Sequence, residues 1–177
     1  MVNAIRAGDV IERITIIRNG PDARAFKADQ AAFDTYLASA RAAGAARLEE
    51  QRGADLARVA SQYPDLVEDP SGLLYKILKN GDGPRAEPGK TVGLSYRGMF
   101  ISGEVFDDSD FTGRLLEFVV GSGRVIPGFD QAVRDMRRGE RRLVVIPPEL
   151  AYGERGAGGV IPPNAFLVFE MELVQVR

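Results

Sequence analysis

Few side chains in this sequence are suited to chemistry, because it contains no histidine and no cysteine. Their absence excludes Ser-His and Cys-His nucleophilic pairs, the usual zinc sites and thiol redox reactions. Asp107, Asp108 and Asp110 stand close together, but the glycine and the distal glutamate of a helix-loop-helix calcium site are missing. The glycine-rich stretches 121–124 and 153–159 have neither the Gly-Lys-Ser/Thr ending of a phosphate-binding loop nor the spaced glycines of a dinucleotide site. We therefore expect no metal and no cofactor.

The C-terminal part of the chain has the pattern of a pocket with a loop beside it. Tyr152 precedes Gly153, so its ring leaves the chain at a turn, and residues 154–159 include three glycines that can adopt backbone angles other residues avoid. Pro162 and Pro163 then stiffen the return of the chain into a terminal apolar strand.

The elements that would position these side chains begin at Leu73. Runs of apolar and β-branched residues alternate with turns of Gly, Pro, Asp and Asn, which predicts strands, and one helix is predicted from Gly128 to Met136. Pro127 stands just before this helix and Gly139 just after it, as is typical of helix ends. An α+β domain follows from this order. The predicted strands are 73–81, 90–100, 116–121, 140–147 and 166–177.

A helical arm is predicted before this domain, from about Asp22 to Tyr63. The segment is rich in Ala, Arg, Glu and Leu; Gly44 and Gly53 favour a bend or a break, so one long helix and a helical pair both stay open, and Pro64 ends it. Its apolar stripe has to be covered either by the rest of the chain or by a second chain. The stripe comprises Phe26, Phe33, Leu37, Ala40, Leu48, Leu56, Val59 and Tyr63.

The first residues form a third part. Residues 10–18 alternate apolar and polar side chains, which predicts a strand, and Asn19-Gly20-Pro21 ends it. The predicted organisation is thus an N-terminal strand segment (1–21), a helical arm or linker (22–66) and a C-terminal domain (70–177).

Composition limits the class of partner. The hydrophobic and charged fractions, 45% and 27%, are those of a globular protein, and the net charge of −2 with scattered basic residues argues against nucleic acid. The basic run at 137–142 is interpreted as a solvated turn. No run of 18 apolar residues and no secretory leader is present, so we expect no membrane partner and a cytoplasmic location, unless a targeting segment precedes Met1.

Five motifs in order, YRGMF, GEVFDDS, VIPGF, AYG and IPPN followed by LVFEMEL, resemble the FKBP family of peptidyl-prolyl cis-trans isomerases, the macrolide-binding immunophilins. The resemblance covers about residues 72–177. It implies a curved antiparallel five-stranded sheet wrapped around one short helix, here preceded by the helical arm and the N-terminal strand. It also implies an enzyme that accelerates rotation about X-Pro bonds in protein clients.

The resemblance also implies the site. Phe129 would form the floor under the proline ring, Tyr152 and the Ile126 N–H would donate hydrogen bonds to the peptide, and Asp107 would be a buried carboxylate with an orienting, electrostatic role. Asp107, Tyr152 and Phe106 are the expected catalytic residues, whereas Asp108, Ser109 and Asp110 are expected at the turn and surface. The expected substrate-binding residues are Tyr96, Phe106, Leu116, Val125, Ile126, Phe129, Tyr152, Ile161 and Phe169.

The sequence departs from the family pattern at the pocket. Phe129 stands where tryptophan is usual, Leu116 where phenylalanine is frequent, and Thr112 where an arginine often pairs with the pocket aspartate. A shallower pocket with weakened macrolide affinity is expected. One alternative function is a module that holds proline-containing segments without turnover, while the arm supplies a chaperone or homodimer surface.

Residues 1–21 resemble the last strand of a cyclophilin, the other large prolyl-isomerase family. This implies a protein that combines both isomerase families, of which the present chain would be the C-terminal part.

Overall fold

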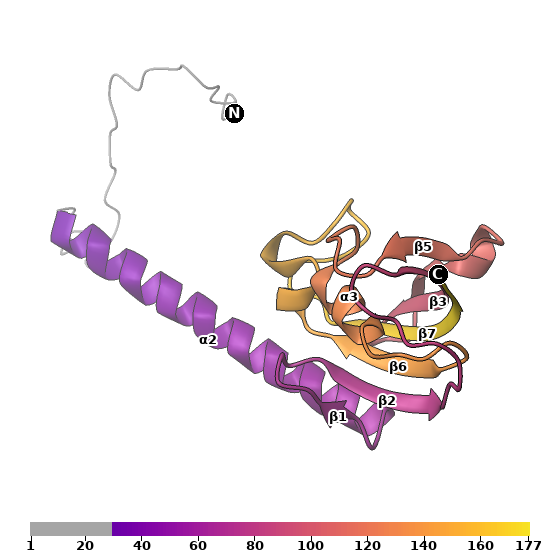
Figure 1. Cartoon of the computed structure of the whole chain (residues 1–177). Helices are drawn as coiled ribbons and strands as arrows, with labels where there is room; N and C mark the ends of the chain where they lie inside the picture. Colours follow the sequence, from indigo (N-terminus) through magenta and orange to yellow (C-terminus); the bar gives the residue numbers. More distant parts are fainter. Residues whose placement is uncertain (1–29) are drawn as a thin grey trace, which may run out of the picture. The chain divides into compact units, whose positions relative to one another are not determined.

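The computed structural model describes residues 30–177, shown in colour in Figure 1. Two compact units are distinguished, residues 1–48 and residues 49–177. The predicted N-terminal strand segment 1–21, with its cyclophilin resemblance, lies outside the described residues, as does the start of the arm at 22–29.

The arm is one uninterrupted helix, α2, from Gln30 to Gln62. The Cβ positions of Gly44 and Gly53 face open space, and each glycine costs only about 1 kcal/mol relative to alanine, so their helix-forming neighbours carry the helix through. The helical-pair alternative is therefore wrong for the described part of the arm. Neither of the described helices is both long and apolar enough to cross a bilayer.

The C-terminal domain is built on one antiparallel sheet (Figure 1). All five predicted strands are present, and two short strands, β1 and β4, add to them. The spatial order is β1-β2-β6-β7-β3-β4, and β5 pairs with β3. The bounds are β1 Val67–Glu68, β2 Leu74–Lys79, β3 Thr91–Phe100, β4 Val105–Asp108, β5 Leu116–Val119, β6 Arg141–Ile146 and β7 Leu167–Val176, with short 3₁₀ turns η1 Ser109–Phe111, η2 Pro148–Leu150 and η3 Gly153–Arg155.

The short helix α3, Pro127–Val133, packs against one face of this sheet, and the strands bend around it in Figure 1. Proline at the first helical position is favourable, because its fixed φ suits a helix start. A Cβ on Gly128 would lie 2.3 Å from the Ile146 side chain, so a glycine is required for this close approach. α3 ends three residues before the predicted Met136, which is buried in the turn that follows.

The last turns of α2 cover the other face of the sheet. Successive strand residues point to opposite faces, and β7 accordingly contributes Leu167 to the core under α3 and Val168 to a second cluster with Val59. Val59 is buried, and Arg52 pairs with Glu149. The end of the predicted apolar stripe, at Val59 and Tyr63, is thus covered within the chain, whereas Leu56 is 37% exposed.

Candidate functional site

An apolar cavity of about 400 Å³ lies between β3, β4, β5, β7, the start of α3 and the turn at Tyr152. Nine of the ten site residues predicted from sequence line it, and Arg124, which was not predicted, lines it as well. The tenth, Ile161, does not line it and is instead buried in the core under α3. The lining residues are Tyr96, Phe106, Asp107, Leu116, Arg124, Val125, Ile126, Phe129, Tyr152 and Phe169.

Phe129 forms the centre of an aromatic cluster at the base of this cavity. Its ring is 3% exposed and meets Tyr96 and Phe169 edge-to-face, with centroids 5.7 and 5.2 Å apart. Phe118, behind the cavity, makes a third contact at 6.1 Å. Edge-to-face pairs of this kind contribute about 0.5–1.5 kcal/mol each beyond burial. The base of the cavity is therefore apolar and aromatic.

Gly98 makes room for two of these rings, a function the sequence analysis missed. A Cβ at this position of β3 would lie 2.8 Å from the ring of Phe106 and 2.9 Å from that of Phe169. The two rings themselves meet edge-to-face at 5.8 Å. An isolated glycine inside a strand pattern is a signal of close approach, and it was available in the motif YRGMF.

One carboxylate, Asp107, stands at the wall of the cavity. The hydroxyl of Tyr96 donates a hydrogen bond of 2.6 Å to its Oδ2. Burial first, and the Asp107 carboxylate second, raise the pKa of Tyr96 well above its ordinary value, so this hydroxyl stays protonated and remains a donor. The expectation that Asp107 is buried was wrong: its side chain is exposed, because the cavity opens to solvent on that side.

Two hydrogen-bond donors at the cavity have no partner among the described residues. The Tyr152 side chain is 42% exposed and its hydroxyl makes no hydrogen bond within residues 30–177. Ile126 is the residue before α3, and its N–H donates no hydrogen bond to any residue of 30–177. Both donors are thus free for a ligand in the cavity.

The loop after Tyr152, residues 153–163, is closed on itself and is called the flap loop here. The backbone groups of Ala157 and Ile161 exchange hydrogen bonds of 3.0 and 2.9 Å. Gly156 has φ +62°, and a Cβ there would lie 2.1 Å from the Ile161 carbonyl, so only glycine fits. Ile161, at 8% exposure, packs in the core and so anchors this loop.

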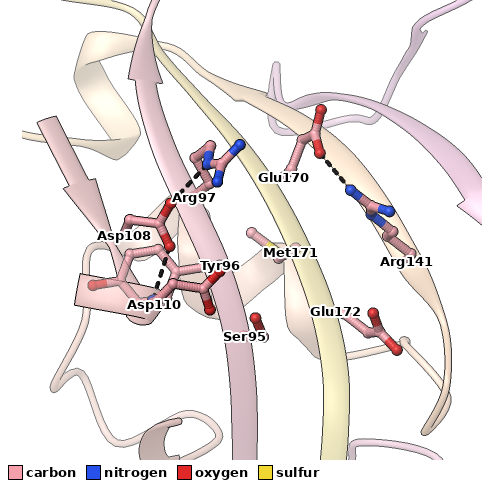
Figure 2. Close-up of a pocket in the computed structure, with 9 residues that line it drawn as sticks. All are labelled: Ser95, Tyr96, Arg97, Asp108, Asp110, Arg141, Glu170, Met171 and Glu172. Atoms are coloured by element: carbon pink, nitrogen blue, oxygen red, sulfur yellow. Dashed lines mark hydrogen bonds and ion pairs between the residues drawn. The ribbon is translucent and has the colours of Figure 1, made fainter. Parts of the chain in front are cut away.

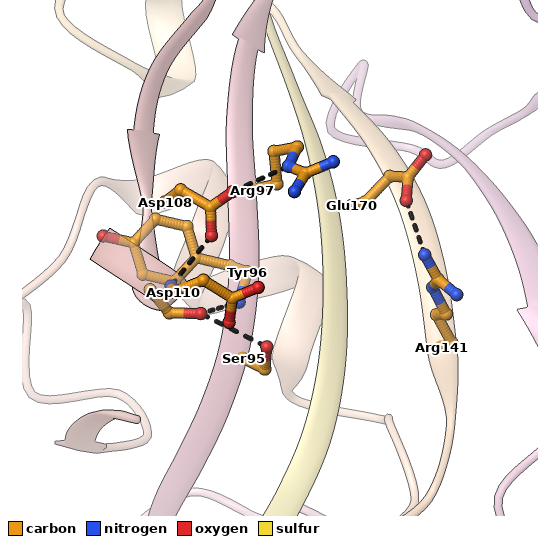
Figure 3. Close-up of polar contacts among 8 residues, drawn as sticks. Ser95, Tyr96, Arg97, Asp108, Asp110, Arg141 and Glu170 are labelled. Atoms are coloured by element: carbon orange, nitrogen blue, oxygen red, sulfur yellow. Dashed lines mark hydrogen bonds and ion pairs between the residues drawn. The ribbon is translucent and has the colours of Figure 1, made fainter. Parts of the chain in front are cut away.

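A polar network on the other face of β3 holds β4 and its 3₁₀ turn in place (Figures 2 and 3). The Arg97 Nε donates a 2.7 Å hydrogen bond to Asp108, which also accepts one from the Asp110 N–H. The Ser109 hydroxyl accepts a bond from the Tyr96 N–H. The Arg97 guanidinium and the Asp110 N–H hold the pKa of Asp108 below its usual range.

The expectation that Asp108 and Ser109 are surface groups was therefore wrong. Both are buried, at 4% and 6% exposure. Strand alternation explains why: if Asp107 faces the apolar cavity, its neighbour has to face the opposite side of β4. Asp110 is exposed, as expected.

This network borders a second, smaller pocket of about 240 Å³ (Figure 2). Both of its arginines are already paired with carboxylates, Arg97 with Asp108 and Arg141 with Glu170, each at 2.7 Å. No group of three or more metal-ligating side chains is found in residues 30–177. The apolar cavity, with its free donors, is consequently the candidate site.

A curved antiparallel sheet around one helix, with an aromatic pocket and free hydrogen-bond donors, defines a peptide-binding isomerase of the immunophilin class. The family model described as FKBP-type peptidyl-prolyl cis-trans isomerase matches residues 83–174, and the chain belongs to this family. The resemblance found in the sequence is confirmed, and the activity of the family is peptidyl-prolyl cis-trans isomerisation.

Several known proteins are similar to this chain. The peptidyl-prolyl cis-trans isomerase FPR2 of Saccharomyces cerevisiae is 52% identical over 107 residues, 60% of this chain and 79% of that protein. FK506-binding protein 2 of Yarrowia lipolytica is 47% identical over 105 residues, 59% of this chain and 73% of that protein. The crystal structure of FkpA from Escherichia coli matches with a TM-score of 0.63 at 31% identity, over 88% of this chain and 78% of that one.

Proposed function

We propose that the apolar cavity is the isomerase site, and that it binds an X-Pro segment of a client protein with the proline ring over Phe129. The observation that carries this proposal is the pairing of an aromatic floor with two free donors, the Tyr152 hydroxyl and the Ile126 N–H. A proline ring has no donor and suits an apolar floor, while the carbonyls beside it need donors.

The chemistry requires no proton transfer. The barrier to rotation about the X-Pro bond is about 18–20 kcal/mol, because the amide resonance is lost when the bond twists. The twisted group is less dipolar than the planar one, so an apolar and dry cavity favours it over water. An acceleration of about 10⁴- to 10⁶-fold needs roughly 5.5–8 kcal/mol, which desolvation, orientation and a few hydrogen bonds can supply.

The polar groups of the cavity have separate roles in this proposal. The Tyr152 hydroxyl and the Ile126 N–H donate to client carbonyls and hold the peptide, while Phe106 forms one wall. Asp107, oriented by the hydrogen bond from Tyr96, places negative charge beside the carbonyl that rotates. We assign Asp107 an electrostatic role, because the Tyr96 hydroxyl that donates to it stays protonated and transfers no proton.

We also propose that the cavity binds macrolides of the FK506 type, as the names of its relatives suggest, with reduced affinity. Phe129 and Leu116 present smaller contact surfaces than the tryptophan and phenylalanine usual at these positions. Each lost aromatic contact weakens binding by about 0.5–1.5 kcal/mol.

A direct test is an NMR exchange or protease-coupled assay of cis/trans interconversion in a Leu-Pro tetrapeptide. Wild-type protein should accelerate exchange, the Asp107→Ala and Phe129→Ala variants should lose most of the acceleration, and rapamycin should inhibit. A folded wild-type chain that leaves the exchange rate unchanged would reject the enzyme and leave the proline-binding module.

A second role, in dimerisation or client holding, is favoured by one feature of α2. Phe33 and Tyr36, one helical turn apart, are 54% and 66% exposed. Two large aromatic side chains on one exposed helix face are suited to a second copy of this helix or to an unfolded client.

A further inference from the structure

A second apolar groove, of about 450 Å³, lies beside the flap loop. The turn after β3, the return of the flap loop and the part of α2 that belongs to the isomerase unit form its walls. Its apolar lining includes Phe100, Val160, Pro162 and Phe166. Val160 is 59% exposed.

The groove lies next to the proposed isomerase site. The ring of Phe100, in the groove, packs on the ring of Phe106, in the isomerase cavity, with centroids 5.0 Å apart. The two sites are therefore joined by this pair of rings, past which a bound polypeptide can extend from one site to the other.

The rim of the groove is negatively charged. Asp55 on α2 and Glu104 before β4 line it, and neither carboxylate forms an ion pair with a described residue. A cation beside the groove, Arg52, lies 5.8 Å from the centroid of the Phe166 ring and is already paired with Glu149. The free charge at this surface is therefore acidic.

We propose that this groove holds the client polypeptide beside its proline, as an extended segment with apolar side chains next to a lysine or arginine. The proposal rests on the proposed isomerase function. The apolar walls fit the apolar side chains, and Asp55 and Glu104 fit the cation. The groove gives the enzyme affinity for unfolded chains that a tetrapeptide does not reveal.

The test compares peptides that share one Leu-Pro core. The short form has four residues, and the long forms carry an apolar-basic or an apolar-acidic extension on either the N- or the C-terminal side. In fluorescence anisotropy, the apolar-basic extension on one side should bind about ten-fold more tightly than the short peptide. The apolar-acidic extension on that side should bind about three-fold or more weaker than the basic one. Amide NMR shifts at Phe100 and Phe166 should accompany only the long peptides.

Charge reversal by Asp55→Lys with Glu104→Lys should invert the preference between basic and acidic extensions. Turnover of the tetrapeptide should stay unchanged. The matched control, Asp82→Lys with Glu87→Lys, makes the same change of charge at exposed acids outside the groove and should leave the preference intact.

Equal affinity for short and long peptides, or an unaltered charge preference in the reversal variant, would overturn the groove proposal. Tetrapeptide turnover reports on the isomerase cavity alone. A failure of the proposed function would thus appear as absent turnover, and a failure of the groove as absent gain from the extension.

Discussion

At the scale of single residues, the cavity combines aromatic rings that pack against one another with hydrogen-bond donors that have no partner in the described chain. Phe129 is surrounded on three sides by other rings, whereas the Tyr152 hydroxyl has no protein partner in the described chain. Substitutions at these two positions should accordingly differ. Loss of the ring should affect both stability and turnover, and loss of the hydroxyl should affect turnover alone.

Replacement of Phe129 by leucine should reduce kcat/KM for a Leu-Pro tetrapeptide by about ten-fold, because the edge-to-face contacts that shape the floor are lost. The matched control is Phe118→Leu, since Phe118 is equally buried at 3% but does not line the cavity. Both variants should lose roughly 1–2 kcal/mol of unfolding free energy. Similar turnover in the two variants would contradict the role of Phe129 as the floor.

Replacement of Tyr152 by phenylalanine should reduce kcat/KM by about three- to ten-fold, the net value of one hydrogen bond to the client. The free energy of unfolding should not change, because the hydroxyl bonds to nothing in the described protein. Tyr36→Phe, at an exposed tyrosine on α2, is the control and should retain full turnover. An unchanged kcat/KM in Tyr152→Phe would remove this hydroxyl from the mechanism.

The sequence could predict most members of the cavity, because ordered motifs carry them. The sequence did not predict the lining correctly at two positions. Ile161 was expected to line the cavity because it lies in a family motif, but its side chain is buried in the core, where it anchors the flap loop. Arg124 was missed because nothing in its type distinguishes a cavity wall from a solvated surface.

At the scale of elements, β3 carries the site on one face and its support on the other. Tyr96 points into the cavity, while Arg97 on the opposite face binds Asp108 and so fixes β4 (Figure 3). Five strands could be predicted from their apolar runs. β4 could not, because its four residues end in two aspartates that are typical of turns.

Alanine at two glycines should have opposite effects. Gly98→Ala should destabilise the protein by about 1–3 kcal/mol and reduce turnover, because the added methyl group meets the rings of Phe106 and Phe169. Gly53→Ala should stabilise it by about 0.5–1 kcal/mol with turnover unchanged, because that helical position faces open space. Chemical denaturation measures both. A neutral Gly98→Ala variant would show that the rings have room to move.

The Arg97–Asp108 pair predicts a dependence of stability on pH. Since the pKa of Asp108 is lower in the folded chain than in the unfolded chain, the unfolded state binds the proton more readily. The stabilisation by this pair is fully present above the pKa of Asp108 in the unfolded chain, which is about 4. It is lost as the pH falls through the lower pKa of Asp108 in the folded chain. Asp108→Asn should therefore destabilise the protein more at pH 6 than at pH 3. Equal losses in urea unfolding at both pH values would contradict the pairing.

At the scale of the whole molecule, the two halves of α2 have different surroundings. Near its C-terminal end Val59 is buried in a cluster with Val145 and Val168, so this half is part of the isomerase unit. The other half exposes Phe33 and Tyr36. The sequence could predict the apolar stripe but not which half the domain covers, since one amphipathic pattern suits both an internal and an external partner.

We predict that the exposed half of α2 joins two copies of the chain. Sedimentation velocity of the full chain should show a dimer at micromolar concentrations, and Phe33→Ser with Tyr36→Ser should shift it to the monomer, because about 1.5–3 kcal/mol is gained for each large apolar side chain that is buried. Tetrapeptide turnover per chain should be the same in both forms, since the cavity lies entirely within residues 49–177. The exposed valine of β1, Val67→Ser, is the control for a general loss of surface apolarity. A wild-type chain that stays monomeric throughout would leave these aromatic side chains to unfolded clients, in which case the double variant should lose holding activity towards an aggregating protein instead.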